Sequence, residues 1–234
     1  MSENIKKITK AFVVDLDSRE NQNILKPSAR PFNNQAHQVD EVAKKIYKLI
    51  KDAKHPNDDI ILNHNKIKEA FFSPFKPQLK SAQVFLSHSH ADKNKALEVK
   101  NYLESETNHR VFIFIDSLFW DYKDDVLNEL EKYDDTSKIE DAFTLILRES
   151  LQDMIEKCPY FVFLQSNNSV SCNQYLSCIT YSAWIYEELK IAHSIRESRP
   201  TPMMESWQVF HNISPFLESL ETITLKKLSR IINS

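Results

Sequence analysis

Hydroxyl, imidazole and carboxylate side chains gather in one short stretch, S-H-S-H-A-D, at residues 87–92. The run that leads into it, Gln83 to Ser87, is mostly apolar and predicts a buried strand, and a helical pattern follows it. A buried strand that ends in polar residues places them at one edge of its sheet. Two chemistries fit this stretch. The turn could line a nucleotide pocket, or a metal ion could be bound by His88, His90 and Asp92.

The metal hypothesis rests on a similarity to the H-x-H-x-D-H signature of metallo-β-lactamase-like enzymes. In that signature imidazoles and a carboxylate bind zinc, which generates hydroxide. The position of the last histidine is Lys93 in this chain, and a cation there would repel a second metal. The other histidines show no ligand spacing. A zinc hydrolase that uses His88, His90 and Asp92 is therefore the lesser alternative.

A second chemical candidate is a carboxylate in a helix predicted at residues 180–195. One stripe of the helical wheel carries Trp184, Glu188, Ile191 and Ile195. The adjacent polar stripe carries Glu187, so we expect Glu187 to face solvent and Glu188 to face the protein interior. Carboxylates are seldom buried without a reason. The plain alternative is a structural salt bridge or a glutamate at the edge of the helix.

Alternating strands and helices are predicted from residue 80 onward. Apolar runs indicate strands at residues 83–87, 110–115 and 160–164, with helical patterns between them. Such strands are typical of a parallel sheet that helices cover on both faces. Ligands bind at the carboxyl ends of strands in these folds. Three polar clusters are therefore expected at one edge of the sheet, at residues 87–90, 116–120 and 165–168.

The chain is expected to divide near residue 80. Residues 1–80 predict a mainly helical N-terminal extension, in which residues 12–16 could form a short strand. Residues 81–234 predict the α/β domain, with an inserted helix around 121–137 in the long connection after its second strand. No convincing apolar strand follows residue 195, so the sheet is expected to be truncated or rearranged.

The composition excludes several classes of function. The chain has no glycine, where average usage predicts about 16, and P-loop and classical Rossmann sites need glycine so that the backbone can approach phosphates. A net charge of -3 provides no basic field for nucleic acid. Three cysteines, an odd number, argue against a disulfide framework, and no apolar run is long enough to span a membrane. We expect a cytoplasmic protein that binds neither nucleic acid nor membrane.

Four motifs in order, across residues 82 to about 196, resemble the Toll/interleukin receptor (TIR) domain family. They are V-F-L-S-H-S-H-A-D-K, F-I-D-S, Y-F-V-F-L-Q-S and Y-S-A-W-I-Y-E-E-L. The family helix after the third strand carries Ser-x-Trp with a Glu four residues after the Trp, and Ser182, Trp184 and Glu188 match this spacing. The resemblance implies a flavodoxin-like parallel sheet with helices on both faces. For enzymatic members it also implies cleavage of NAD at the bond between nicotinamide and ribose.

The resemblance implies that Glu188 is the catalytic residue. Breaking the bond develops oxocarbenium character on the ribose, and a nearby carboxylate stabilises that charge. Nicotinamide leaves as a neutral molecule, so one carboxylate suffices without a general acid. NAD is then a substrate rather than a cofactor, and no metal takes part. The substrate-binding residues that the resemblance implies are Ser87, His88, Ser89, Asp116, Ser117, Trp120, Ser182 and Trp184.

The resemblance also implies partners. A chain that has no transmembrane segment and keeps the Trp and the Glu is similar to the bacterial enzymatic branch, which serves in antiviral signalling. The expected product is ADP-ribose or a signal nucleotide derived from it, to which an effector protein would respond. Self-association through TIR–TIR contacts is expected as well. Because animal receptor and adaptor members mostly act as scaffolds, a noncatalytic TIR-like interaction scaffold is the alternative function.

Overall fold

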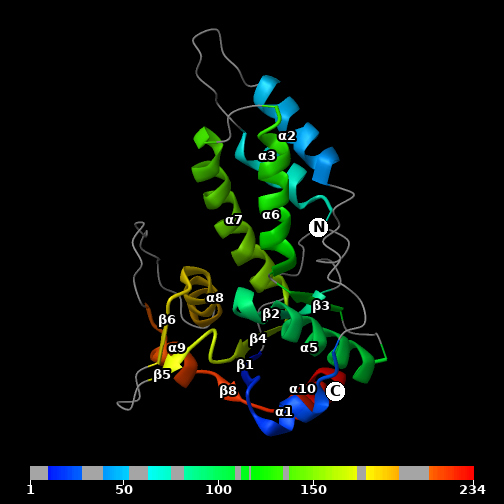
Figure 1. Ribbon diagram of the computed structural model, residues 1–234, viewed down its shortest axis with the longest axis vertical. Coiled ribbons are helices and arrows are strands. Elements are labelled where there is room, and N and C mark those ends of the chain that lie inside the picture. The colour runs from blue at the N-terminus through cyan, green and yellow to red at the C-terminus, as the bar shows by residue number, and fades with distance from the viewer. Residues whose placement is uncertain are drawn as a thin grey trace, which may run out of the picture. The chain divides into compact units, whose positions relative to one another are not determined.

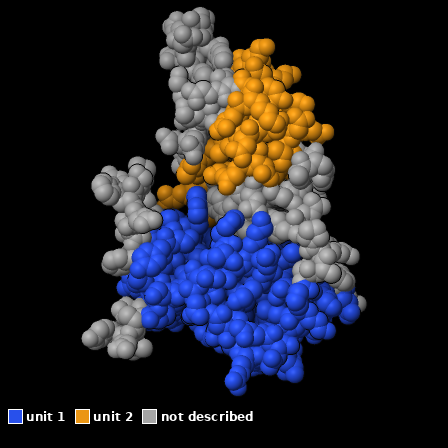
Figure 2. Space-filling view, in the orientation of Figure 1, with its two compact units in different colours: residues 1–31, 81–117, 152–234 blue, residues 32–80, 118–151 orange. Residues whose placement is uncertain are grey.

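The computed structural model describes most of the chain in nine segments: residues 10–27, 39–52, 63–74, 82–108, 112–115, 117–133, 137–172, 178–194 and 211–234. The chain forms two compact units (Figure 2). Unit 1 comprises residues 1–31, 81–117 and 152–234, and unit 2 comprises residues 32–80 and 118–151. Each unit is built from segments that are distant in the sequence.

A parallel sheet forms the core of unit 1 (Figure 1). Its strands are β1 (Lys10–Asp15), β2 (Ala82–Ser87), β3 (Phe112–Ile115), β4 (Tyr160–Gln165) and β8 (Glu221–Thr222). They lie in the order β3-β2-β4-β1-β8, and every adjoining pair is parallel. The apolar runs A-F-V-V, V-F-L and F-V-F-L in three of these strands are buried throughout, as expected for strands covered on both faces. The predicted α/β class with a parallel sheet is confirmed.

The helices of unit 1 cover this sheet. They are α1 (Arg19–Ile24), α5 (Lys93–Glu106), the last part of α7 (Ser137–Lys157), α8 (Ala183–Ser194), α9 (Ser214–Glu218) and α10 (Leu225–Asn233), with a 3-10 helix at His90–Asp92. Helix α5 packs against β3 and α10, and Asn233 Nδ2 donates to the carbonyl of Glu106 at 3.1 Å. Figure 1 shows α5 and α10 on one side of the sheet and α8 on the other.

The N-terminal strand corrects the expected domain boundary. Residues 1–80 were expected to form a helical extension, but β1 lies between β4 and β8, with Lys10 opposite Tyr160 and Phe12 opposite Glu221. The physical reason is the run A-F-V-V, whose four residues are at most 2% exposed. Four consecutive apolar side chains point to both faces of a strand, so only an interior position in a two-sided sheet buries them all.

The strand order agrees only in part with a flavodoxin-like fold. If the five strands are numbered by their order in the chain, so that β8 is the fifth, the sheet reads 3-2-4-1-5. The flavodoxin-like order is 2-1-3-4-5. If β2 is counted as the first strand, β3-β2-β4 reproduces the first three positions of that order, 2-1-3. β1 then occupies the fourth position, which in the flavodoxin-like order belongs to a later strand. The rearrangement expected from the lack of apolar strands after residue 195 therefore takes the form of an N-terminal strand that fills the gap.

Unit 2 is helical. It contains α2 (Val39–Asp52), α3 (His64–Phe72), most of α6 (Ser117–Leu130) and the first part of α7 (Ser137–Lys157). The helix expected around 121–137 is thus α6, which begins and ends earlier. The ring of Phe71 makes edge contacts with Tyr122 and Phe143, at centroid distances of 5.3 and 5.8 Å. Because Tyr122 is buried in this aromatic core, the pKa of its phenol is raised.

A small antiparallel sheet also belongs to unit 1. Its strands are β5 (Ser171–Cys172), β6 (Cys178–Thr180) and β7 (His211–Asn212). Cys172 and Cys178 stand opposite each other and form a disulfide, while Cys158 is a buried thiol. The odd number of cysteines was expected to argue against a disulfide framework; the structure has this one bond, since a single cross-strand pair needs only two cysteines in register. Among the residues that the structure describes, none of the helices is long and apolar enough to cross a membrane.

Candidate functional site

The carboxyl ends of β2, β3 and β4, the three strands that the sequence predicted, lie at one edge of the sheet because these strands are parallel. β2 ends at Ser87, and its parallel neighbour β4 ends at Gln165. The chain leaves β2 toward β3 on one side and leaves β4 toward β8 on the other, so the strand order reverses between them. Ligands of open α/β sheets bind outside the carboxyl ends of strands at such a reversal. This edge is the candidate site.

Ser87 and Glu188 meet at this edge. The Ser87 hydroxyl donates a hydrogen bond to Glu188 Oε2 at 2.5 Å, and neither residue has exposed surface. A buried carboxylate is costly unless hydrogen bonds replace its lost hydration, and this donor supplies one of them. The predicted inward orientation of Glu188 is confirmed, and the structure adds a partner that helical periodicity could not identify.

Helix α8 carries Glu188, and Ser182 fixes where the helix begins. The amide of Ile185 donates to the Ser182 hydroxyl at 3.3 Å, and the amide of Tyr186 donates to the Ser182 carbonyl at 3.1 Å. A serine in this position satisfies backbone donors of the first helical turn. Ser182, which was predicted to bind substrate, therefore acts as the cap of the helix. Trp184 lies in the first turn of α8 and is half-buried.

Glu187 departs from the prediction. It was expected to face solvent, but only 5% of it is exposed, and its carboxylate lies 3.7 Å from the ammonium group of Lys190. The prediction assumed that α8 packs along a single stripe. The helix also packs against α9 and β6, so more of its surface is buried. The ion pair with Lys190, one turn later, accompanies the burial of this second carboxylate.

The other predicted site residues have different environments. His88 follows β2 directly and is 3% exposed, whereas Ser89 is half-buried and His90 is exposed. Ser117 and Trp120 lie in α6, of which the structure describes only the backbone at these positions. Asp116 lies outside the described residues. The structure thus brings Ser87 and Glu188 into contact, and it buries His88, which follows Ser87 in the chain.

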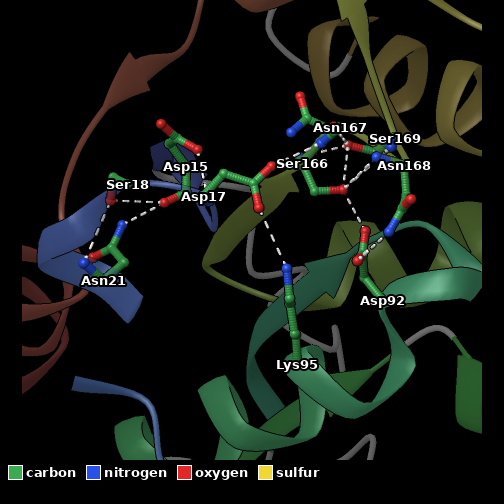
Figure 3. A network of polar contacts seen from close by, with 10 residues as sticks. All are labelled: Asp15, Asp17, Ser18, Asn21, Asp92, Lys95, Ser166, Asn167, Asn168 and Ser169. Atoms are coloured by element: carbon green, nitrogen blue, oxygen red, sulfur yellow. Dashed lines mark hydrogen bonds and ion pairs between the residues drawn. The ribbon is translucent and has the colours of Figure 1, made fainter. Parts of the chain in front are cut away.

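A polar network, which the sequence analysis did not predict, ties three strand ends together (Figure 3). Asp92 is 2% exposed, and its carboxylate accepts hydrogen bonds from the Ser166 hydroxyl and, at 2.8 Å, from Asn168 Nδ2. Asp17, which follows β1, accepts from the amide of Asn167 at 2.9 Å and from Lys95 Nζ at 3.3 Å. The loop after β4 is therefore fixed to the segments that follow β1 and β2.

The network engages one of the three residues that the metal hypothesis requires. Both carboxylate oxygens of Asp92 accept hydrogen bonds from neutral side chains. His88 is buried while His90 is exposed, so the two imidazoles lie in different environments. The part of the chain that the structure describes contains no group of three histidine, cysteine or acidic side chains that could hold a metal ion. His90 and Asp92 lie in the 3-10 helix that follows β2, whereas His88 precedes it.

Comparison with known proteins adds no relative, since no protein-family model, no curated protein and no solved structure matches the chain. The site and its chemistry therefore rest on the residues and their geometry.

Proposed function

We propose that the protein cleaves the nicotinamide–ribose bond of NAD, as a TIR-type NAD glycohydrolase or cyclase, with Glu188 as the catalytic carboxylate. The observation that carries this proposal is the contact between Glu188 and Ser87 at the carboxyl end of β2. The acidic group lies beside the reversal of strand order, where open α/β sheets bind their ligands. The resemblance to TIR motifs supplies the reaction that such a carboxylate would perform.

The chemistry needs one negative charge close to the ribose. As the bond to nicotinamide breaks, positive charge develops on the ribose, and the Glu188 carboxylate would stabilise it. The interaction gains strength inside the protein, because the surroundings of Glu188 exclude water and the local dielectric constant is low. The Ser87 hydroxyl holds one carboxylate oxygen in place, so the orientation of the charge is set before substrate arrives.

The burial of Glu188 sets a condition on this mechanism. A residue with no exposed surface cannot touch NAD until neighbouring side chains move. The proposed enzyme therefore has an opening step, which a trigger or self-association through TIR–TIR contacts would supply. The product would be ADP-ribose or a signal nucleotide derived from it, made in the cytoplasm during antiviral defence and sensed by an effector protein.

Two adjacent glutamates provide the test. Purified wild-type protein is incubated with NAD over a range of protein concentrations, and released nicotinamide is measured by chromatography with mass spectrometry. We expect Glu188→Gln to lower turnover by roughly a hundredfold or more, the loss that follows removal of a preorganised charge-stabilising group. Glu187→Gln is the matched control, because it makes the same change at the next residue, which is also buried, and it should keep turnover.

The fold of both variants is checked by circular dichroism. Equal turnover by the wild type and Glu188→Gln would refute the catalytic assignment. A wild-type protein that self-associates but stays inactive at every protein concentration would favour the alternative function, a noncatalytic TIR-like scaffold. The full burial of Glu188 is the observation that suits this alternative, since a structural carboxylate needs no access to solvent. A scaffold would self-associate to the same extent in the wild type and in the Glu188→Gln variant, and neither protein would release nicotinamide.

A further inference from the structure

A disulfide joins two segments that flank the candidate site. Cys172 ends β5 and Cys178 begins β6, and the two residues stand opposite each other in the antiparallel ladder. β5 comes shortly after the Ser166–Ser169 loop that follows β4. β6 comes shortly before α8, which carries Glu188. The disulfide therefore links the chain that leaves β4 to the chain that enters α8.

This pair, unlike the third cysteine, is accessible. Cys172 is exposed and Cys178 is half-buried, and both residues of β5 are exposed. Cys158 has no exposed surface. Exchange between a thiol and a disulfide requires a thiolate to reach one of the two sulfur atoms. The greater exposure of Cys172 therefore favours attack of a thiolate at its sulfur atom.

β5 is a short strand that the disulfide fastens to β6. It has two residues, and among the described residues its strand partner is β6. The bond closes a short loop, with a sequence separation of 6. Because a cross-link stabilises a fold least when its loop is short, loss of the bond should cost unit 1 little stability. β6 keeps other partners, because it pairs with β7 and the Cys178 amide donates to the Ser214 hydroxyl at 2.6 Å. Breaking the bond should therefore free β5 while unit 1 stays folded.

We propose that Cys172 and Cys178 form a reversible redox site whose reactant is a dithiol reductant. A thiolate of the reductant attacks Cys172 Sγ, the bond between the two sulfurs breaks, and Cys178 leaves as a thiolate that takes up a proton. The second thiol of the reductant attacks the mixed disulfide and releases Cys172. Two electrons and two protons pass to the protein, and the reductant becomes a disulfide. In a reducing compartment, disulfides are mostly transient or redox-sensing.

The Cys172–Cys178 disulfide is placed to control local order at the candidate site. Thr180 ends β6, and its hydroxyl accepts a hydrogen bond from the amide of Ser182 at 3.2 Å. Ser182 in turn caps α8. Loss of the disulfide loosens the start of this chain of contacts and the end of the β4 loop together. Disulfide exchange and local order at these strands do not depend on cleavage of NAD.

Differential alkylation tests the redox site itself. Native protein is treated with iodoacetamide before and after dithiothreitol, and the labelled cysteines are found by peptide mass spectrometry. We expect no label at Cys172 or Cys178 before reduction and full label at both after it, with Cys158 protected throughout. Removal of the reductant in air should restore protection. Label at both residues before reduction, or at Cys158 together with them, would overturn the proposal, because either result means that the pair is unbonded or that reduction unfolds unit 1.

Hydrogen exchange tests the structural consequence. After reduction we expect amides in segments 170–172 and 178–182 to exchange about tenfold faster or more, while those in β2 and β4 keep their rates. The variant Cys172→Ser should exchange rapidly in these segments with or without dithiothreitol. Cys158→Ala is the matched control and should respond to dithiothreitol as the wild type does. Unchanged exchange in the two segments after proven reduction would overturn the proposed link to local order.

Discussion

The Ser87 hydroxyl donates a 2.5 Å hydrogen bond to the carboxylate of Glu188, although the two residues are 101 positions apart in the chain. This contact joins the end of a central strand to the helix that covers it. Both partners are fully buried, so water cannot replace either of them. The contact should therefore affect stability whether or not the protein is an enzyme.

The variant Ser87→Ala removes the donor and should lower the free energy of unfolding by about 1–3 kcal/mol, the cost of losing a hydrogen bond to a buried charged group. Urea denaturation measures it. In a double-mutant cycle with Glu188→Gln we expect a coupling energy above roughly 0.5 kcal/mol. Ser89→Ala, two residues later and half-buried, is the control and should change stability by less than about 0.5 kcal/mol. Additive effects of the two buried substitutions would contradict the contact.

Asp92 should matter more than Asp17, although both carboxylates belong to the same network. Asp92 is buried and accepts from Ser166 and Asn168, so Asp92→Asn turns one acceptor into a donor that faces another donor. We expect a loss of about 2–3 kcal/mol in urea denaturation. Asp17→Asn affects a partly exposed carboxylate and its ion pair with Lys95, and it should cost less than about 1 kcal/mol. A reversed ranking would show that the buried part of the network contributes little.

Asn21 joins the end of β1 to the start of α10. Its Nδ2 donates to the Asp15 carbonyl at 2.7 Å, and its Oδ1 accepts from the Leu225 amide at 2.9 Å, with only 1% of the residue exposed. Asn21→Ala withdraws both contacts from the backbone and should cost about 2–4 kcal/mol in thermal or urea unfolding. Asn23→Ala on the same helix, at an exposed position, should be nearly neutral. Similar losses in both variants would contradict this role.

The outer edge of β3 is covered by two charged side chains of α5. Lys100 Nζ donates to the carbonyl of Ile113 at 3.0 Å, and the amide of Ile113 donates to Glu104 Oε1 at 3.3 Å. An edge strand with free backbone groups can pair with another chain. Glu104→Leu should therefore produce concentration-dependent oligomers in light scattering, whereas Glu98→Leu on the same helix should not. A monodisperse Glu104→Leu protein would show that this edge needs no cover.

Alkaline pH should destabilise unit 2 through Tyr122. Burial raises the pKa of this phenol above its ordinary value near 10, so its contribution to stability is complete below pH 10. This contribution to stability declines as pH rises through the pKa of the phenol in the unfolded chain, because the unfolded chain then releases a proton that the folded chain keeps. Thermal melts from pH 8 to 11 should fall less steeply for Tyr122→Phe than for wild type. The exposed residue Tyr133 provides the control, since Tyr133→Phe should keep the wild-type slope.

The strands of the central sheet were predictable because burial on both faces requires continuous apolar runs. V-F-L before Ser87 and Y-F-V-F-L at 160–164 therefore predicted β2 and β4 with bounds close to those observed. The inward orientation of Glu188 was predictable for a similar reason, since the helical stripe on which it lies in α8 is otherwise apolar. The place of β1 was not, because its run of four apolar residues fits any interior position, and only pairing with β4 and β8 decides among them.

The contacts of the candidate site were less predictable than its elements. S-N-N-S after β4 has the composition of an ordinary turn, and nothing local indicates that its side chains bind Asp92. The burial of Glu187 follows from packing against α9 and β6, which helical periodicity does not contain. The Cys172–Cys178 pair depends on strand register, which a count of cysteines cannot reveal. These features depend on strand register and tertiary packing, which the local sequence does not contain.

The position of β1 has a consequence for synthesis of the chain. The ribosome makes β1 before the other strands of this sheet, yet its partners are β4, which begins at Tyr160, and β8, which begins at Glu221. Pairings between such distant residues form slowly. The apolar run of residues 11–14 therefore stays unpaired, exposed to water and to other chains, until β4 and β8 have been made. Delayed completion of the sheet makes the nascent chain a natural client for chaperones that bind short apolar segments.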